Sequence, residues 1–98
     1  MGEGDDQAVI RALDFKPSFH KDFRKLSGES QKRVRQALND LMRDPRPKGL
    51  RIEPQQGMTN PKVYTAHVSR GLKFSYEMDG DKAILRRVST HDDIDRKA

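Results

Sequence analysis

The stretch from Leu72 to Ser89 limits the fold more than any other part of the chain. From Leu72 to Met78, apolar residues alternate strictly with polar ones, which is typical of a strand buried on one face. Asp79-Gly80 follows, and this dipeptide favours the tight turn of a β-hairpin. The chain then returns through Lys82 to Ser89 with the apolar run Ala83-Ile84-Leu85. The sequence therefore predicts an antiparallel hairpin whose apolar face needs a second layer.

Upstream, the chain predicts a first strand and a short helix. From Ala8 to Phe15 apolar residues alternate loosely, which favours a strand. Pro17-Ser18 then interrupts it, and Ser18 is the expected N-cap of a helix. The apolar residues that follow recur at helical spacing: Phe19, Phe23 and Leu26. They predict a short helix with one apolar side.

The clearest helical pattern in the chain begins near Glu29 or Ser30. Its apolar residues recur every three or four positions and so share one side. They are Val34, Ala37, Leu38, Leu41 and Met42. Asp44-Pro45 ends the helix, because the residue before a proline disfavours helical geometry. Its basic residues, among them Lys32 and Arg35, fit either contacts to an RNA backbone or an ordinary solvated surface.

Between this helix and the hairpin the signals are those of strands and loops. Lys48 to Glu53 is a short candidate strand, stopped by Pro54. Gln55 to Pro61 is predicted as a polar loop, and Val63 to Val68 as a strand.

The predicted order is β-α-α-β-β-β, an α+β fold with a helical pair on one face of a small, antiparallel-rich sheet. The other face is expected to stay open and polar, with Lys73, Ser75 and Glu77 pointing onto it. If Arg87 keeps the parity of Leu85, it lies on the same side of the last strand as His91.

Composition bounds the class of protein. Its 98 residues fit one domain, taken as residues 8–98 after an acidic, glycine-rich leader of residues 1–7. The absence of cysteine excludes disulfides, cysteine-based zinc sites and thiol catalysis. No apolar run approaches the roughly 20 residues that cross a membrane, so we expect a cytoplasmic protein without a membrane partner. The net charge of +5 favours nucleic acid or an acidic protein as partner.

The end of the chain carries the residues best suited to chemistry. The last strand delivers Arg86-Arg87 and then His91-Asp92-Asp93. Arginine is shaped to bind phosphate, and histidine has an unperturbed pKa near neutrality. This order predicts proton transfer beside an anion, whereas the alternative is a surface in which the arginines pair with the two aspartates. Three adjacent residues do not easily converge on one ion, so no metal site and no cofactor are expected.

These features resemble the RelE/ParE toxin superfamily of bacterial toxin–antitoxin modules. The resemblance covers roughly Phe15 to Arg96. It rests on the element order, on Phe23-Arg24-Lys25-Leu26 before a basic helix, on Asp44-Pro45, and on His91-Asp92-Asp93-Ile94. RelE-like members are ribosome-dependent mRNA endonucleases, and ParE-like members inhibit DNA gyrase. The resemblance thus implies an acidic antitoxin, the ribosome and mRNA as partners.

The resemblance also implies roles for individual residues, most closely through its YoeB branch. Glu53 is the implied general base for the RNA 2′-OH, and His91 is the implied acid for the leaving 5′-oxygen. Lys73 stands at the strand position where that branch carries arginine, and with Arg87 it would hold the phosphate. Further RNA or phosphate contacts are expected from Lys48, Arg51, Arg70 and Arg86. The alternative is a non-catalytic binding module, which needs neither His91 nor Glu53.

Overall fold

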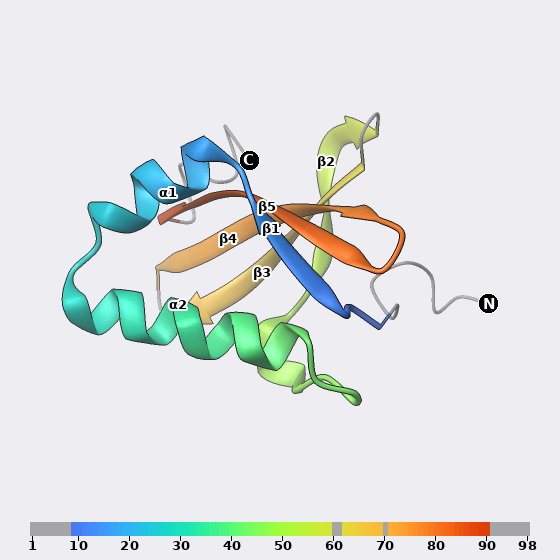
Figure 1. Cartoon of the computed structure of the whole chain (residues 1–98), viewed down its shortest axis with the longest axis horizontal. Helices are drawn as coiled ribbons and strands as arrows, with labels where there is room; N and C mark the ends of the chain where they lie inside the picture. The colour runs from blue at the N-terminus through green and yellow to red at the C-terminus, as the bar shows by residue number, and fades with distance from the viewer. Residues whose placement is uncertain (1–8, 60–61, 70, 91–98) are drawn as a thin grey trace.

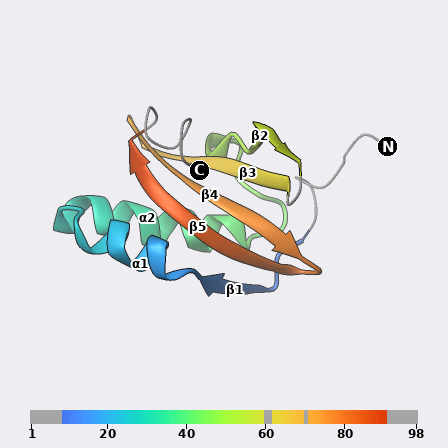
Figure 2. The same cartoon turned by 90° about the horizontal axis from the view of Figure 1, so that it is seen from above.

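Two helices cover one face of a sheet, as Figures 1 and 2 show in two orthogonal views. The structure is a computed structural model and describes residues 9–59, 62–69 and 71–90. The elements run in the order β1 (Ala12–Phe15), α1 (Pro17–Arg24), α2 (Gly28–Leu41), the 3₁₀ helix η2 (Lys48–Leu50), β2 (Glu53–Thr59), β3 (Lys62–Ser69), β4 (Leu72–Asp79) and β5 (Lys82–Thr90). The predicted α+β class, with its helical pair on one face, is confirmed.

The sheet has five strands within the described residues, in the order β1-β5-β4-β3-β2. Pairing is antiparallel except between β1 and β5, which run parallel. The chain can join these two strands in parallel because the helices and the other strands lie between them in sequence. The predicted antiparallel hairpin is β4 and β5, and Gly80 at its turn has a φ of 64°, which favours glycine.

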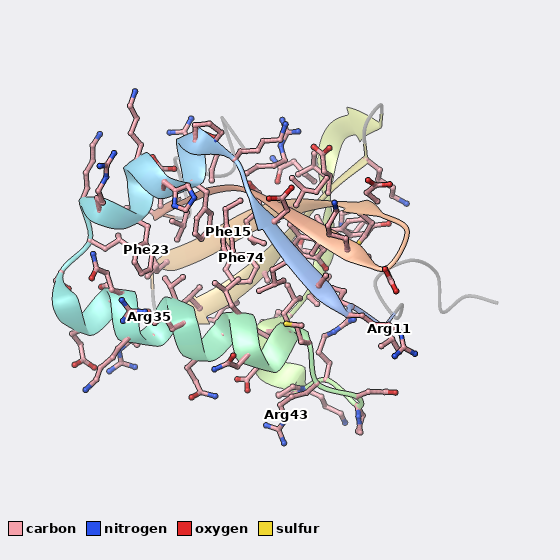
Figure 3. The ribbon with its side chains drawn as sticks, viewed as in Figure 1. Arg11, Phe15, Phe23, Arg35, Arg43 and Phe74 are labelled. Atoms are coloured by element: carbon pink, nitrogen blue, oxygen red, sulfur yellow. The ribbon has the colours of Figure 1, made fainter. Side chains whose placement is uncertain are left out.

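The core lies between the helices and the sheet. Figure 3 shows Phe15, Phe23 and Phe74 in this layer. The alternation in β4 buries Phe74 and Tyr76, and Tyr76 stacks on Tyr64 of β3 with ring centroids 5.6 Å apart. The helices contribute Phe19, Val34, Ala37, Leu38 and Leu41. Full burial of each large side chain contributes about 1.5–3 kcal/mol, so this layer is the main source of stability.

The segment after α2 differs from its prediction. Instead of a strand over Lys48–Glu53, the chain forms η2, and β2 then runs from Glu53 to Thr59 through the segment predicted as a loop. Leu50 is the reason, because it is buried in the core and the 3₁₀ turn brings it there. Pro54 does not stop the strand, because β2 is at the sheet edge, where a missing donor is tolerated. The order is therefore β-α-α-β-β-β-β.

Both helix starts also differ from their predictions. The N-cap of α1 is Lys16, with Pro17 at the first helical position, where its missing N–H costs no hydrogen bond. The hydroxyl of Ser18 instead donates a hydrogen bond to the backbone oxygen of Arg86, at 2.6 Å. The N-cap of α2 is Ser27, whose side chain accepts from the Ser30 N–H at 3.1 Å. That helix therefore begins at Gly28, just before the predicted start.

Candidate functional site

The strand register places the predicted base in a row that crosses the sheet. Glu53 of β2 pairs with Thr65 of β3, Thr65 with Ser75 of β4, and Ser75 with Arg87 of β5. Three strand spacings of about 4.8 Å separate the backbone of Glu53 from that of Arg87 by roughly 14 Å. Glu53 is exposed at the edge, so its carboxylate is accessible to a ligand.

A second row lies beside the first on the same face. Lys73 pairs with His67 of β3 on one side and with Ser89 of β5 on the other. Lys73 lies two residues from Ser75, and side chains two apart in a strand share a face. Glu53, His67 and Lys73 therefore face the side of the sheet opposite the helices. Lys73 and His67 are both half-buried.

The centre of this face is not open, which corrects the sequence prediction. Ser75 is fully buried, and its neighbours Thr65 and Val63 are buried as well. Within the described residues the Ser75 Oγ has no hydrogen-bond partner. The polar character expected of the face is confined to its surroundings, where Glu53 is exposed and Lys73 and Glu77 are half-buried. The charged groups of this face therefore lie around a closed centre.

A bulge in β5 separates the two arginines. The register shifts between Ser75 and Tyr76, which pair with Arg87 and Leu85, so that Arg86 is the extra residue. The prediction that Arg87 lies on the same face of the strand as Leu85 is therefore wrong. Val88 is the next buried residue after Leu85.

The guanidinium of Arg87 contacts the helix layer. Its Nε donates to Asp22 of α1 at 2.7 Å and its Nη2 at 3.1 Å, a two-bonded pair of the kind that fixes geometry. The same carboxylate accepts from the Val88 N–H at 3.1 Å. The Asp22 side chain is only 10% exposed and that of Arg87 33%. Arg87 is thus a fixed cation at the junction of α1 and β5.

Arg86 contacts the face that carries Lys73. Its Nη1 forms an ion pair with Glu77 of β4, and both side chains are largely shielded from solvent. Glu77 lies two residues from Ser75 and so belongs to the face opposite the helices. The structure therefore brings Arg86 together with this face and ties Arg87 to α1.

The remaining predicted residues lie elsewhere. Lys48 and Arg51 are exposed and line a pocket at the end of α2. Arg70, His91 and the predicted leader are outside the described residues. His91 follows Thr90, the last residue of β5, and Thr90 pairs with Leu72, the neighbour of Lys73.

The arginines of α2, and Arg43 just after it, have partners within the molecule. Arg33 pairs with Glu29 at 3.3 Å, one helical turn away, and Arg43 with Asp40 at 3.5 Å. Arg35 lies over the ring of Phe23, with its guanidinium carbon 5.4 Å from the ring centroid; both side chains are labelled in Figure 3. These contacts favour the interpretation of this helix surface as a solvated one.

Sequence reasoning missed Asp22. The signal was its place in the helix, three residues after Phe19 and four before Leu26, which puts a carboxylate beside the apolar side. In the described part of the chain, no group of three or more metal-ligating side chains gathers. No helix there has the length and apolar character to span a membrane.

Comparison with known proteins adds structural relatives only. No protein-family model and no curated protein matches the sequence. The RelB–RelE antitoxin–toxin complex of Methanococcus jannaschii contains a chain with a TM-score of 0.65 and 26% identity, over 83% of this chain and 93% of that chain. The fold is that of the RelE-like toxins.

Two further structures agree with this RelE-like fold. HP0894 of Helicobacter pylori has a TM-score of 0.64 at 22% identity, over 85% of this chain and 97% of that one. The DinJ–YafQ complex of E. coli contains a chain with a TM-score of 0.62 at 20% identity, over 86% and 97%. The resemblance inferred from the sequence is confirmed at the level of the fold.

Proposed function

We propose that this chain is the toxin of a toxin–antitoxin module and acts as a ribosome-dependent mRNA endonuclease. The observation that carries the proposal is the shared face of Glu53 and Lys73, which puts a carboxylate and a cation in adjacent rows of one sheet. The RelE-like fold supports the toxin assignment.

In the proposed reaction the nucleophile belongs to the substrate. Glu53 takes the proton of an RNA 2′-OH, the 2′-oxygen attacks the adjacent phosphorus, and the bond to the 5′-oxygen breaks. His91 gives a proton to that leaving oxygen. A positioned acid or base contributes about 10²–10⁴ in rate, so the two together supply much of the expected acceleration.

The charge that builds on the phosphate needs cations. Lys73 supplies one from the sheet face, and Arg86 supplies a second from the β5 bulge. Arg87, which is held in place by its hydrogen bond to Asp22, adds positive charge near the phosphate. Arg70 is an outer contact.

We also propose that an acidic antitoxin neutralises the chain. RelE and YafQ were solved as complexes with RelB and DinJ. The net charge of +5 complements an acidic partner.

Induction of the chain in bacteria tests the proposal, with growth and mRNA integrity as readouts. We expect growth arrest with mRNA cuts spaced by codons, and loss of both in His91→Gln and in Glu53→Gln. Thr90→Ser is the matched control beside His91 and should retain both. Arrest with intact mRNA in all variants would contradict the nuclease and indicate another target.

A non-catalytic module of the same fold is the second candidate. The observation that favours it is the pairing of Arg86 with Glu77 and of Arg87 with Asp22, because a cation held by a carboxylate presents less charge to phosphate. Normal growth with intact mRNA after induction would support this candidate.

A further inference from the structure

A pocket of about 390 Å³ lies where α2 ends and the chain turns into β2. We call it the corner pocket, and the connection from Arg43 to Ile52 lines it together with Val9. Figure 1 shows this connection passing from the end of α2 through η2 into β2. Its volume falls within the range of small-ligand sites, about 300–1,000 Å³.

The charge of the corner pocket is strongly positive. Its lining contains four cations, Arg43, Arg46, Lys48 and Arg51, and one carboxylate, Asp44. Figure 3 shows Arg43 extending outward from the end of α2. Its ion pair with Asp40 is exposed on the arginine side and neutralises it only weakly. An anion is therefore the ligand that this lining favours.

The walls of the corner pocket are fixed by the fold. The Nε of Arg46 donates to the backbone oxygen of Leu41 at 2.9 Å, at the last residue of α2. Leu50 is 4% exposed and anchors η2 in the core. Arg51 has a φ of 46°, which turns the chain sharply before β2. The hydrogen bond of Arg46 and the buried Leu50 therefore fix the backbone from which the cations of the pocket extend.

The corner pocket also has an apolar part. Val9 is 37% exposed and is the exposed large hydrophobic residue of the described chain. Ile52 and two prolines line the pocket with it. A ligand that combines an anion with a flat or weakly polar body matches both parts.

We propose that the corner pocket binds one nucleotide of a single-stranded RNA, with the phosphate on Lys48 and Arg51 and the ribose or base against Val9 and Ile52. The inference rests on the proposed function in naming RNA. Ile52 directly precedes Glu53, and consecutive Cα atoms lie about 3.8 Å apart. Glu53 lies on the face opposite the helices and Ile52 packs toward the core, so the two flank the edge strand β2. An RNA chain bound at Glu53 reaches the corner pocket by turning around this edge, which favours RNA over an acidic peptide.

Binding to an uncleavable RNA tests the inference apart from catalysis. The probe is a 2′-O-methyl RNA hexamer, which lacks the attacking 2′-OH, and its Kd is measured by fluorescence anisotropy at several salt concentrations. In Lys48→Gln/Arg51→Gln we expect Kd to rise about tenfold. The slope of the logarithm of the association constant against the logarithm of the salt concentration should become less negative by about 1.4. Each lost single-strand phosphate contact accounts for about 0.7 of this change.

The matched control removes the same charge elsewhere. Lys21→Gln/Lys25→Gln changes two exposed lysines at the end of α1, and its Kd should change less than twofold. An equal effect in both double variants, or none in either, would overturn the inference.

Methyl NMR locates the ligand. The methyl signals of Val9 and Ile52 should shift with the hexamer and not with inorganic phosphate alone. Equal shifts with phosphate would leave only an anion site, and shifts with a Glu-Leu peptide but not with RNA would indicate a protein-binding surface; either result contradicts the inference. Hexamer binding at the corner pocket in a chain that does not cleave mRNA would overturn the nuclease and leave this inference standing.

Discussion

The arginines of β5 and the cations of the corner pocket carry the same charge in opposite settings. Arg86 and Arg87 each contact a largely buried carboxylate, Glu77 and Asp22. Lys48 and Arg51 are exposed on a lining where cations outnumber carboxylates. The basic residues of this chain therefore fall into two groups. Carboxylates of the fold hold the β5 arginines in place, whereas the corner pocket leaves Lys48 and Arg51 exposed.

The contacts of β5 show how its arginines are held in place. Strand β1 ends at Phe15, and beyond it α1 supplies partners for the outer edge of β5. The Lys16 N–H donates to Leu85 at 2.9 Å, and Ser18 and Asp22 bond the backbone of Arg86 and Val88. Asp22 therefore provides a hydrogen-bond acceptor for the part of the β5 edge that has no neighbouring strand.

The largest expected effect comes from Asp22→Ala. The free energy of unfolding should fall by about 3 kcal/mol, because a shielded guanidinium and the Val88 N–H lose their acceptor. Urea denaturation measures it. Asp81→Ala, which removes an exposed pair with Arg11 at 3.8 Å, is the control and should cost less than about 0.5 kcal/mol. Equal losses in the two variants would contradict a structural role for Asp22.

Glu77→Gln should have the next largest effect. The amide keeps a hydrogen-bond acceptor for Arg86 and removes the charge, so we expect a loss of about 1–2 kcal/mol by the same denaturation. Glu29→Gln, on the exposed pair with Arg33, provides the comparison. A loss for Glu77→Gln no greater than that of the comparison would show that the Arg86 pair is as weak as a surface pair.

Lys48→Gln/Arg51→Gln should leave stability within about 0.5 kcal/mol of the parent, since both side chains are exposed. Thermal unfolding measures it. Unlike Asp22→Ala, this double variant should lose RNA affinity while its stability stays almost unchanged. A destabilisation above about 1 kcal/mol would place these cations among the structural ones.

Arg33→Ala should have the smallest effect. Its pair with Glu29 is exposed at one-turn spacing, so we expect about 0.3 kcal/mol, vanishing at high salt. Unfolding in low and high salt measures it. An effect that persists in high salt would contradict a screened surface pair.

Much of the fold could be predicted because its signals are local. The alternation in Leu72–Met78 and the stripe around Val34 each need only near neighbours, and both elements formed as predicted. β2 was missed because Gln55 to Thr59 carries no apolar alternation. Its pairing with β3 comes from its place at the sheet edge. Leu50 was likewise taken for a strand residue, although a single buried side chain decides the local turn.

The candidate site was harder to predict than the fold. The sequence named Glu53 and Lys73, and the register puts them in adjacent rows of one face. It did not pair Arg87 with Asp22, because the two are 65 residues apart and a bulge reverses the parity of β5. His91 and Arg70 stay predictions.

Local sequence patterns were sufficient to predict the two helices and the hairpin, and composition gives the positive charge and the residue types available for chemistry. Periodicity and turn residues act over a few positions, so they can be found without a structure. Which arginines pair with carboxylates, and which cations stay exposed to solvent, depends on the three-dimensional fold. That choice depends on which carboxylate the fold brings within bonding distance, and such contacts join residues far apart in the chain.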